Sequence, residues 1–399
     1  MVKRTRVIVL NSDPDYAAEL RSDLLNVAGV TIVAETDDPA HLGEVIEGFT
    51  SEVVMINLDT DPTGLLTLVK GLAAKYPNLS LFGISEKEDA QFILASIRAG
   101  MREFLVRPFD RQQLVESFDR VAQQNPEGVK QGRLICAVGS AGGSGCTTLA
   151  TNLACELAAI GQKKVVLVDL DFLSGDVASL LGISPEFSII DLCGSDEAID
   201  QNMVQKALVK HSSGLFVLTS PNRFIKSHQL TLERGAMVIN MLTDNFEYVI
   251  CDGITRSDAT NHILLDMTDT VLLVMQMVLN SVRNADRFMQ KLASEGYNLD
   301  RVEPVINRYA KENSSLYPQD AEEKLGRPIS WIIPSDWKTV SNAANVGQPF
   351  SIFNPKTEVS ESIRNLALKI HDPKNFPKTG DKTNHGREKS GFWEKVLGK

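Results

Sequence analysis

Short β-branched runs alternate with amphipathic stretches along most of this chain. Before residue 125 five such units fit, with strands expected at 6–10, 31–35, 53–58, 80–84 and 103–106. A second series begins at Arg133, with strands expected at 134–139, 164–170, 214–219, 248–252, 270–274 and 302–307, and a last helix near 358–370. This alternation is typical of parallel sheets covered by helices. We therefore predict a flavodoxin-like (βα)5 domain followed by a larger, doubly wound, mostly parallel α/β domain.

Two breaks in the alternation set the expected domain boundaries. Residues 125–132 are polar and contain Pro126 and Gly128, which indicates a linker between domains at 1–124 and 133–371. Residues 372–399 carry seven Lys and Arg against four Asp and Glu, with almost no apolar residue before Phe392. Such a composition cannot bury a core, so we expect a disordered basic tail.

Composition narrows the class of protein. A hydrophobic fraction of 43% and a charged fraction of 23% are ordinary for a globular protein. No run of about 18 apolar residues occurs, and the basic start is not a secretory signal, so we expect a cytoplasmic protein. The five cysteines have no paired metal spacing, which predicts no zinc site. A net charge of -10 argues against broad, non-specific DNA binding.

A glycine-rich string, VGSAGGSGCTT at residues 138–148, follows an expected strand and opens an expected helix at 148–159. In that context its backbone N–H groups and the helix N-terminus can hold phosphate, and a hydroxyl can reach Mg²⁺. The alternative is an ordinary glycine-rich turn. The candidate nucleotide-binding residues are Gly142, Gly143, Ser144, Gly145, Cys146, Thr147 and Thr148.

Two later strands end in carboxylates, at Asp169 and Asp171 in VVLVDLD (165–171) and at Asp252 in YVICDG (248–253). Carboxylates at strand ends beside a phosphate loop suit a metal-bridged phosphate. Their plainer alternative is helix capping. These segments resemble the ParA/MinD family of deviant Walker ATPases, over about residues 133–371.

That resemblance implies a set of roles at an ATP and Mg²⁺ site. Thr147, Asp169 and Asp252 would bind the metal, and Asp171 would position the attacking water. Asn307 would read the adenine, and Arg308 beside it would also bind the nucleotide. The segments IPSD at 333–336 and AANVGQP at 343–349 resemble the family's C-terminal part. The family's two P-loop lysines, however, fall on Ala141 and Cys146.

The loss of both lysines bears on catalysis more than on binding. One lysine neutralises the β- and γ-phosphates and the other crosses to a partner subunit, so both charges are missing here. We expect nucleotide binding to survive and hydrolysis to be slow or absent, so the chain is at most a slow ATPase. Cys146 is either a reactive thiol at a helix N-terminus or a simple steric replacement.

The first 124 residues resemble the receiver domain of response regulators, most closely at AGMREFLVRPF, residues 99–109. Receivers need an acidic pair, an Asp phosphoacceptor, a hydroxyl and a lysine. The corresponding residues are Asn11, Ser12, Asn57, Ser85 and Arg107. Because an amide at the acceptor position cannot form an acyl phosphate, we expect a pseudo-receiver. A shifted alignment could recruit nearby carboxylates, which otherwise cap helices or turns: Asp13, Asp59 and Asp61.

Together the two halves resemble the CpaE/TadZ family of Flp (tight adherence) type IV pilus assembly proteins. The resemblance implies a homodimeric localisation factor, polar or peripheral at the inner membrane, that recruits the pilus assembly ATPase and other pilus machinery proteins. Phe392 and Trp393 with flanking lysines could give the tail a peripheral membrane contact. The alternatives are a ParA-type partitioning ATPase on DNA and a phosphorylation-responsive regulator.

Overall fold

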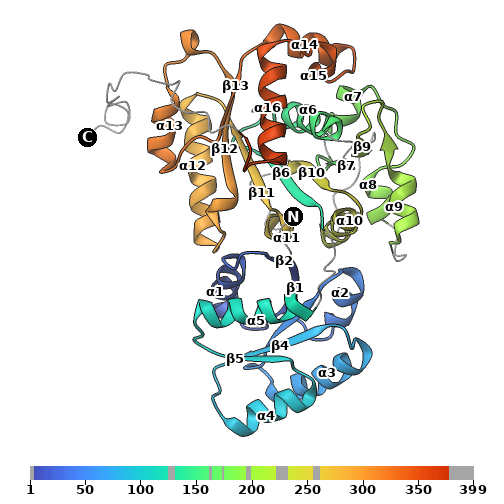
Figure 1. Ribbon diagram of the computed structural model, residues 1–399, viewed down its shortest axis with the longest axis vertical. Helices are drawn as coiled ribbons and strands as arrows, with labels where there is room; N and C mark the ends of the chain where they lie inside the picture. Colours follow the sequence, from blue (N-terminus) through green and yellow to red (C-terminus); the bar gives the residue numbers. More distant parts are fainter. Residues whose placement is uncertain are drawn as a thin grey trace.

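The computed structural model describes residues 4–124, 131–160, 164–172, 175–194, 199–221, 232–254 and 261–376. Two mostly parallel sheets organise these residues, and each is covered by helices on both faces (Figure 1). The sheets belong to an N-terminal unit, from Thr5 to Gln124, and a C-terminal unit, from Arg133 to His371. The α/β class expected from the sequence is thereby confirmed.

In the N-terminal unit five parallel strands lie in the order β2-β1-β3-β4-β5, which is the flavodoxin-like order. Helices α1 and α5 cover one face, and α2, α3 and α4 cover the other. The elements are β1 Thr5–Leu10, α1 Pro14–Leu25, β2 Val30–Thr36, α2 Leu42–Gly48, β3 Val53–Asn57, α3 Pro62–Lys75, β4 Ser80–Ser85, α4 Ala90–Ala99, β5 Glu103–Val106 and α5 Arg111–Gln124.

The C-terminal unit has an eight-stranded sheet in the order β13-β12-β11-β6-β10-β7-β9-β8. All pairs are parallel except β8 with β9. Its inner strands are almost wholly buried, as expected for strands with helices on both faces. The strands are β6 Arg133–Gly139, β7 Val165–Asp169, β8 Val209–Lys210, β9 Phe216–Leu218, β10 Tyr248–Ile254, β11 Thr270–Met275, β12 Val302–Tyr309 and β13 Trp331–Pro334.

Helices α6, α7 and α14 to α16 pack on one face of this sheet, and α8 to α13 lie on the other face or at its edge. They are α6 Cys146–Ala159, α7 Val177–Leu181, α8 Ile189–Cys193, α9 Gln201–Ala207, α10 Leu232–Asn245, α11 Asn261–Met267, α12 Leu279–Ser294, α13 Pro318–Leu325, α14 Trp337–Asn345, α15 Phe350–Phe353 and α16 Glu358–His371, with 3-10 turns η2 Leu299–Arg301 and η3 Lys311–Asn313.

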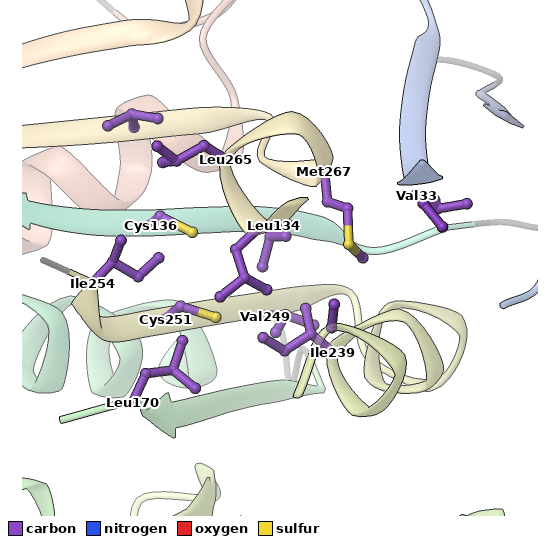
Figure 2. Close-up of a cluster of buried hydrophobic side chains, with 14 of the residues drawn as sticks. Val33, Leu134, Cys136, Leu170, Ile239, Val249, Cys251, Ile254, Leu265 and Met267 are labelled. Atoms are coloured by element: carbon purple, nitrogen blue, oxygen red, sulfur yellow. The ribbon is translucent and has the colours of Figure 1, made fainter. Parts of the chain in front are cut away.

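The two units meet along a seam formed by β1, β2 and α1 against α10, α11 and η2. Edge strand β2 lies against α11, and one apolar cluster runs from Val33 to Leu134 and Met267 (Figure 2). Arg6 is only 1% exposed, and its guanidinium pairs with Glu52 at 2.9 Å and with Asp244 at 2.6 Å. The seam is therefore a continuous core with buried ion pairs.

Further charged contacts fix the same seam. The Arg4 guanidinium contacts Asp269 at 2.5 Å and donates to the Gly132 carbonyl at 3.0 Å. The Arg301 guanidinium donates to the carbonyls of Leu25 at 3.3 Å and Val30 at 3.1 Å. Since backbone acceptors of one unit are satisfied by side chains of the other, relative motion of the units would leave buried polar groups without partners.

Several sequence-based boundaries were wrong. The helix expected from Thr148 begins at Cys146, because Gly145 takes a left-handed φ of 93° and caps it. Strands β8 and β13, of two and four residues, were not predicted. Strands expected to end at 252 and 307 continue to Ile254 and Tyr309.

The expected linker and tail are also partly ordered. Gly132, placed in the linker, donates its N–H to Thr243 at 2.8 Å in the seam. Phe376, placed in the tail, has its ring 5.9 Å from that of Trp331. Residues 125–130 and 377–399, including the expected membrane-contacting cluster at Phe392 and Trp393, lie outside the described residues.

Candidate nucleotide site

The glycine-rich loop joins β6 to α6 and borders a cavity of about 790 Å³. Gly143 and Gly145 have left-handed φ angles of 72° and 93°. A Cβ built on Gly145 would lie 2.3 Å from Asn307 Nδ2, so only glycine fits there. Around Gly142 nothing lies within 4 Å of such a Cβ. The loop thus presents backbone N–H groups to an open cavity at a helix N-terminus, the arrangement that binds phosphate.

The far side of the loop is also held. The Gln276 side chain donates to the Gly143 carbonyl at 2.9 Å, and the Ser140 and Ser281 hydroxyls lie 2.6 Å apart. Gln276 is a residue that the sequence analysis missed, since a lone glutamine after a strand carries no recognisable signal. It fixes the loop from the connection between β11 and α12.

Asp252 is the strongest metal candidate. It is 1% exposed, lines the cavity, and neither of its carboxylate oxygens has a hydrogen-bond partner among the described residues. Burial raises its pKa to about 6. Thr147 lines the same cavity from the first turn of α6. A buried carboxylate left without a partner beside a hydroxyl is a fit for Mg²⁺, which would supply the positive charge.

Asp169 is held by hydrogen bonds from its own surroundings. Its carboxylate accepts from the Asp171 N–H at 3.0 Å, the Ser220 hydroxyl at 3.0 Å and the Val177 N–H at 3.4 Å, and it does not line the cavity. Burial raises its pKa to about 7, and the nearby Asp252 adds to the shift. These hydrogen bonds let Asp169 orient the segment after β7, and its role as a metal ligand stays a prediction.

Asp171 and Asp176, in contrast, both line the cavity. This is where the resemblance placed a water-positioning residue, Asp171. The sequence analysis missed Asp176, which lies beyond the strand-end motif and begins α7. The cavity therefore has carboxylates on one wall and backbone N–H groups on the other.

A second cavity of about 290 Å³ adjoins the first between α6, β13, α14 and α16. Pro334, Asp336 and Trp337 line it, and Trp337 is 80% exposed. Asn307 also lines it, but its side chain donates to the Ser144 carbonyl at 2.9 Å and accepts the Arg308 N–H at 2.9 Å. Its amide braces the loop in this structure, while an aromatic-lined cavity remains beside it for a base.

Comparisons with known proteins bear on the C-terminal unit. Residues 132–296 match the family described as an AAA domain. The MinD septum site-determining protein of Thermotoga maritima is 27% identical over 247 residues, 60% of this chain and 88% of that protein. A ParA family ATPase from Chlorobium tepidum is 25% identical, with a TM-score of 0.56 over 60% of this chain and 99% of its own. The C-terminal unit is a ParA/MinD-like P-loop ATPase domain.

A third match bears on the fold of this ParA/MinD-like domain. MinD of Pyrococcus horikoshii, solved with Mg-ADP, has a TM-score of 0.54 at 18% identity, over 61% of this chain and 98% of its own. Among the described residues no helix is both long and apolar enough to cross a bilayer. The same residues contain no group of three or more His, Cys, Asp and Glu side chains that could hold a metal by themselves.

The two lysine positions of the ParA/MinD-like domain are uncharged. Ala141 and Cys146 both line the cavity. Burial raises the pKa of the Cys146 thiol to about 12, and its Sγ lies 3.5 Å from the Ser144 hydroxyl. A thiol with so high a pKa is not a thiolate at neutral pH, which favours steric replacement over the reactive-thiol alternative.

In the N-terminal unit the residues at the receiver positions bond to one another. Asn57 is 1% exposed and its side chain donates to Asn11 Oδ1 at 2.8 Å. The Ser85 hydroxyl and the Arg107 guanidinium both contact the Asp59 carboxylate at 2.5 Å. Arg107 also stacks on Tyr16, with its Cζ 3.8 Å from the ring centroid. The Arg107 guanidinium thus pairs with Asp59 and not with the residue at position 57.

The nearby carboxylates have structural partners. Asp13 caps α1 by accepting the Asp15 N–H at 3.0 Å, and Asp61 caps α3 by accepting the Gly64 N–H at 3.1 Å. Ser12 donates to the Asp37 carbonyl. The capping alternative therefore holds for Asp13 and Asp61, and Asp59 serves as the counter-ion of Arg107.

The raised pKa of Asp252 makes a pH prediction. We compare the free energies of unfolding of Asp252→Asn and wild type, both without nucleotide and in EDTA. The difference should shift in favour of the variant by about 3 kcal/mol as the pH rises from about 4 to about 7. The unfolded carboxyl ionises near pH 4 and the folded one only near 6, so the wild type loses stability over this window. Urea unfolding of both proteins across that pH range tests this. A constant difference between them would contradict it.

Proposed function

We propose that this protein binds ATP with Mg²⁺, dimerises, and positions the Flp/Tad type IV pilus secretion machinery, with weak or no ATP hydrolysis. The observation that carries the proposal is the state of the phosphate cavity. Asp252 and Thr147 remain on the metal side, while Ala141 and Cys146 stand at the lysine positions. Such a site favours holding a nucleotide over accelerating its cleavage, which needs charge stabilisation at the γ-phosphate.

The N-terminal unit supports the same proposal as a pseudo-receiver that serves as a docking surface. Its β2 edge is occupied by the seam, whereas α4 exposes Leu94 at 54% and Ile97 at 45% on the side away from the C-terminal unit (Figure 1). Exposed apolar side chains next to one another suit a protein partner. The pilus assembly ATPase, other pilus proteins or a second copy of this chain are the partners we propose.

The pseudo-receiver makes a chemical prediction. Acetyl phosphate with Mg²⁺ should leave the protein unphosphorylated, because Asn57 cannot form an acyl phosphate and Asp59 is held by Arg107 and Ser85. Intact mass before and after hydroxylamine treatment measures this, with a receiver that retains its aspartate as the positive control. A stoichiometric, hydroxylamine-labile adduct would instead support a phosphorylation-responsive regulator.

The localisation role is tested in cells. A fluorescent fusion should form a discrete focus, polar or at the inner membrane, together with the pilus secretion machinery, and Asp252→Asn should disperse it while protein levels stay equal. A fusion that follows the nucleoid would support the partitioning alternative, which the net charge of -10 disfavours. A diffuse wild-type fusion in piliated cells would contradict the proposal.

A further inference from the structure

We propose that Arg308 takes over, within the same chain, the phosphate-neutralising charge that the missing P-loop lysine would supply. This inference rests on the proposed binding of ATP and goes beyond it, because it assigns a compensating cation to a site that lacks its usual one. Arg308 was expected to bind the nucleotide, next to the Asn307 that would read the adenine. Its place at the end of β12 puts it where the base cavity and the phosphate cavity meet.

Arg308 lies where its side chain can reach bound phosphate. Arg308 lines both cavities, and among the described residues it is the one Lys or Arg that lines the phosphate cavity. A Cβ built on Gly145 would lie 3.8 Å from Arg308 Nη2, so the guanidinium lies at the loop that cradles the phosphates. From there it can reach the phosphate chain from the side nearer the base.

The backbone at Arg308 has an unusual conformation. Arg308 has a φ of 54°, and it is the one non-glycine residue with a positive φ among the described residues. A left-handed conformation costs energy for an arginine, and such outliers persist where surrounding contacts enforce them. Asn307 enforces this one, because its side chain accepts the Arg308 N–H and donates to the Ser144 carbonyl. The bend ties β12 to the P-loop and directs the chain at Arg308 toward it.

The charges around the phosphate cavity also favour this role for Arg308. Three carboxylates line the phosphate cavity, those of Asp171, Asp176 and Asp252, and the metal would offset part of their charge. The Arg308 side chain is exposed and forms no ion pair within the described part of the chain, so its guanidinium is available to an anion. A guanidinium can bind two phosphate oxygens at once, which a single ammonium cannot match in geometry.

The test uses Arg308→Gly, because glycine accepts the left-handed φ that arginine adopts at a cost. Binding of fluorescent ATP, ADP and adenosine derivatives is measured with Mg²⁺. We expect ATP and ADP to bind about 10- to 100-fold more weakly and adenosine to be unaffected. The nucleotide-free variant should also melt about 2 °C higher than wild type. A merely structural role for Arg308 would not combine higher stability with weaker phosphate-dependent binding.

Three further variants sharpen the result. Arg308→Lys should keep most of the affinity, and Lys311→Ala, which removes a nearby exposed cation that lines neither cavity, should keep all of it. Cys146→Lys should raise ATP affinity about tenfold in the Arg308→Gly background and less in wild type, since the two cations would serve the same phosphates. Equal gains in both backgrounds would contradict the inference.

The outcomes separate this inference from the proposed function. If wild type binds no ATP, both fail. If wild type binds ATP and Arg308→Gly binds it as tightly, only the assignment of Arg308 fails. If Arg308→Gly keeps ATP affinity but loses ATP-dependent self-association, Arg308 acts across a dimer, and the assignment within one chain is overturned.

Discussion

Arg6→Ala should lower the free energy of unfolding by about 3–5 kcal/mol. The Arg6 side chain is buried between the units and neutralises Glu52 and Asp244, at 2.9 and 2.6 Å. Removing it leaves two carboxylates, each less than a fifth exposed, without the cation that they share. Guanidinium-induced unfolding, followed by fluorescence and circular dichroism, measures the loss.

The matched control is Arg98→Ala, which removes an exposed arginine in the last turn of α4 and should lower the free energy of unfolding by less than about 1 kcal/mol.

The same unfolding experiment also tests whether the two units unfold cooperatively. Because one apolar cluster spans both units, wild type should unfold in a single transition that the substitution weakens or splits. If Arg6→Ala were as mild as Arg98→Ala, the seam would not be the rigid contact described above.

Mg²⁺ should strengthen ATP binding by wild type, and Asp252→Asn should reduce this gain in affinity by about 100-fold or more. Even partners that only orient a metal ligand typically change metal affinity 10- to 100-fold, and Asp252 is placed to act on the metal side directly. An amide keeps the shape of the side chain and removes its charge. Titration of a fluorescent ATP derivative with and without Mg²⁺ gives the ratio of affinities.

Asp61→Asn is the matched control, because it makes the same chemical change at the α3 cap, where asparagine also caps well. It should leave the Mg²⁺ dependence unchanged. The nucleotide-free Asp252→Asn protein should meanwhile be at least as stable as wild type near neutral pH, since a buried carboxylate without a partner is lost. A large loss of stability would mean that reduced binding reflects misfolding and not the site.

The sheets could be predicted because their strands are long apolar runs of about the expected length. The positions of β1, β3, β6 and β11 follow from buried residues alone. Strand β8 could not be predicted, since two residues are too few to show a period. Strand β13 was not predicted either, although it is as long as β5, which was. The contact between the two units could not be predicted either. Arg6 is an ordinary polar residue at the start of a strand in the sequence, and only the fold brings its partners Glu52 and Asp244 to it.

At the candidate site the sequence predicted residue types better than their roles. Asp252 and Thr147 line the cavity as expected, whereas Asp169, also at the end of a strand, is turned into hydrogen bonds with its own unit. Strand-end position alone cannot separate these two outcomes, since it does not fix the side-chain direction. The left-handed backbone at Arg308 could not be predicted either, because arginine, unlike glycine or asparagine, does not favour that conformation.

We expect this chain to retain ATP with little or no hydrolysis, and the fate of bound nucleotide can be followed over time. Purified protein is incubated with Mg²⁺ and ATP labelled on the α-phosphate, and bound and total nucleotide are separated and identified over time. We expect close to one labelled ATP retained per chain, with turnover far below about 1 per second, the lower end of the ordinary enzyme range. Turnover at or above that rate, or no retained nucleotide, would contradict this expectation.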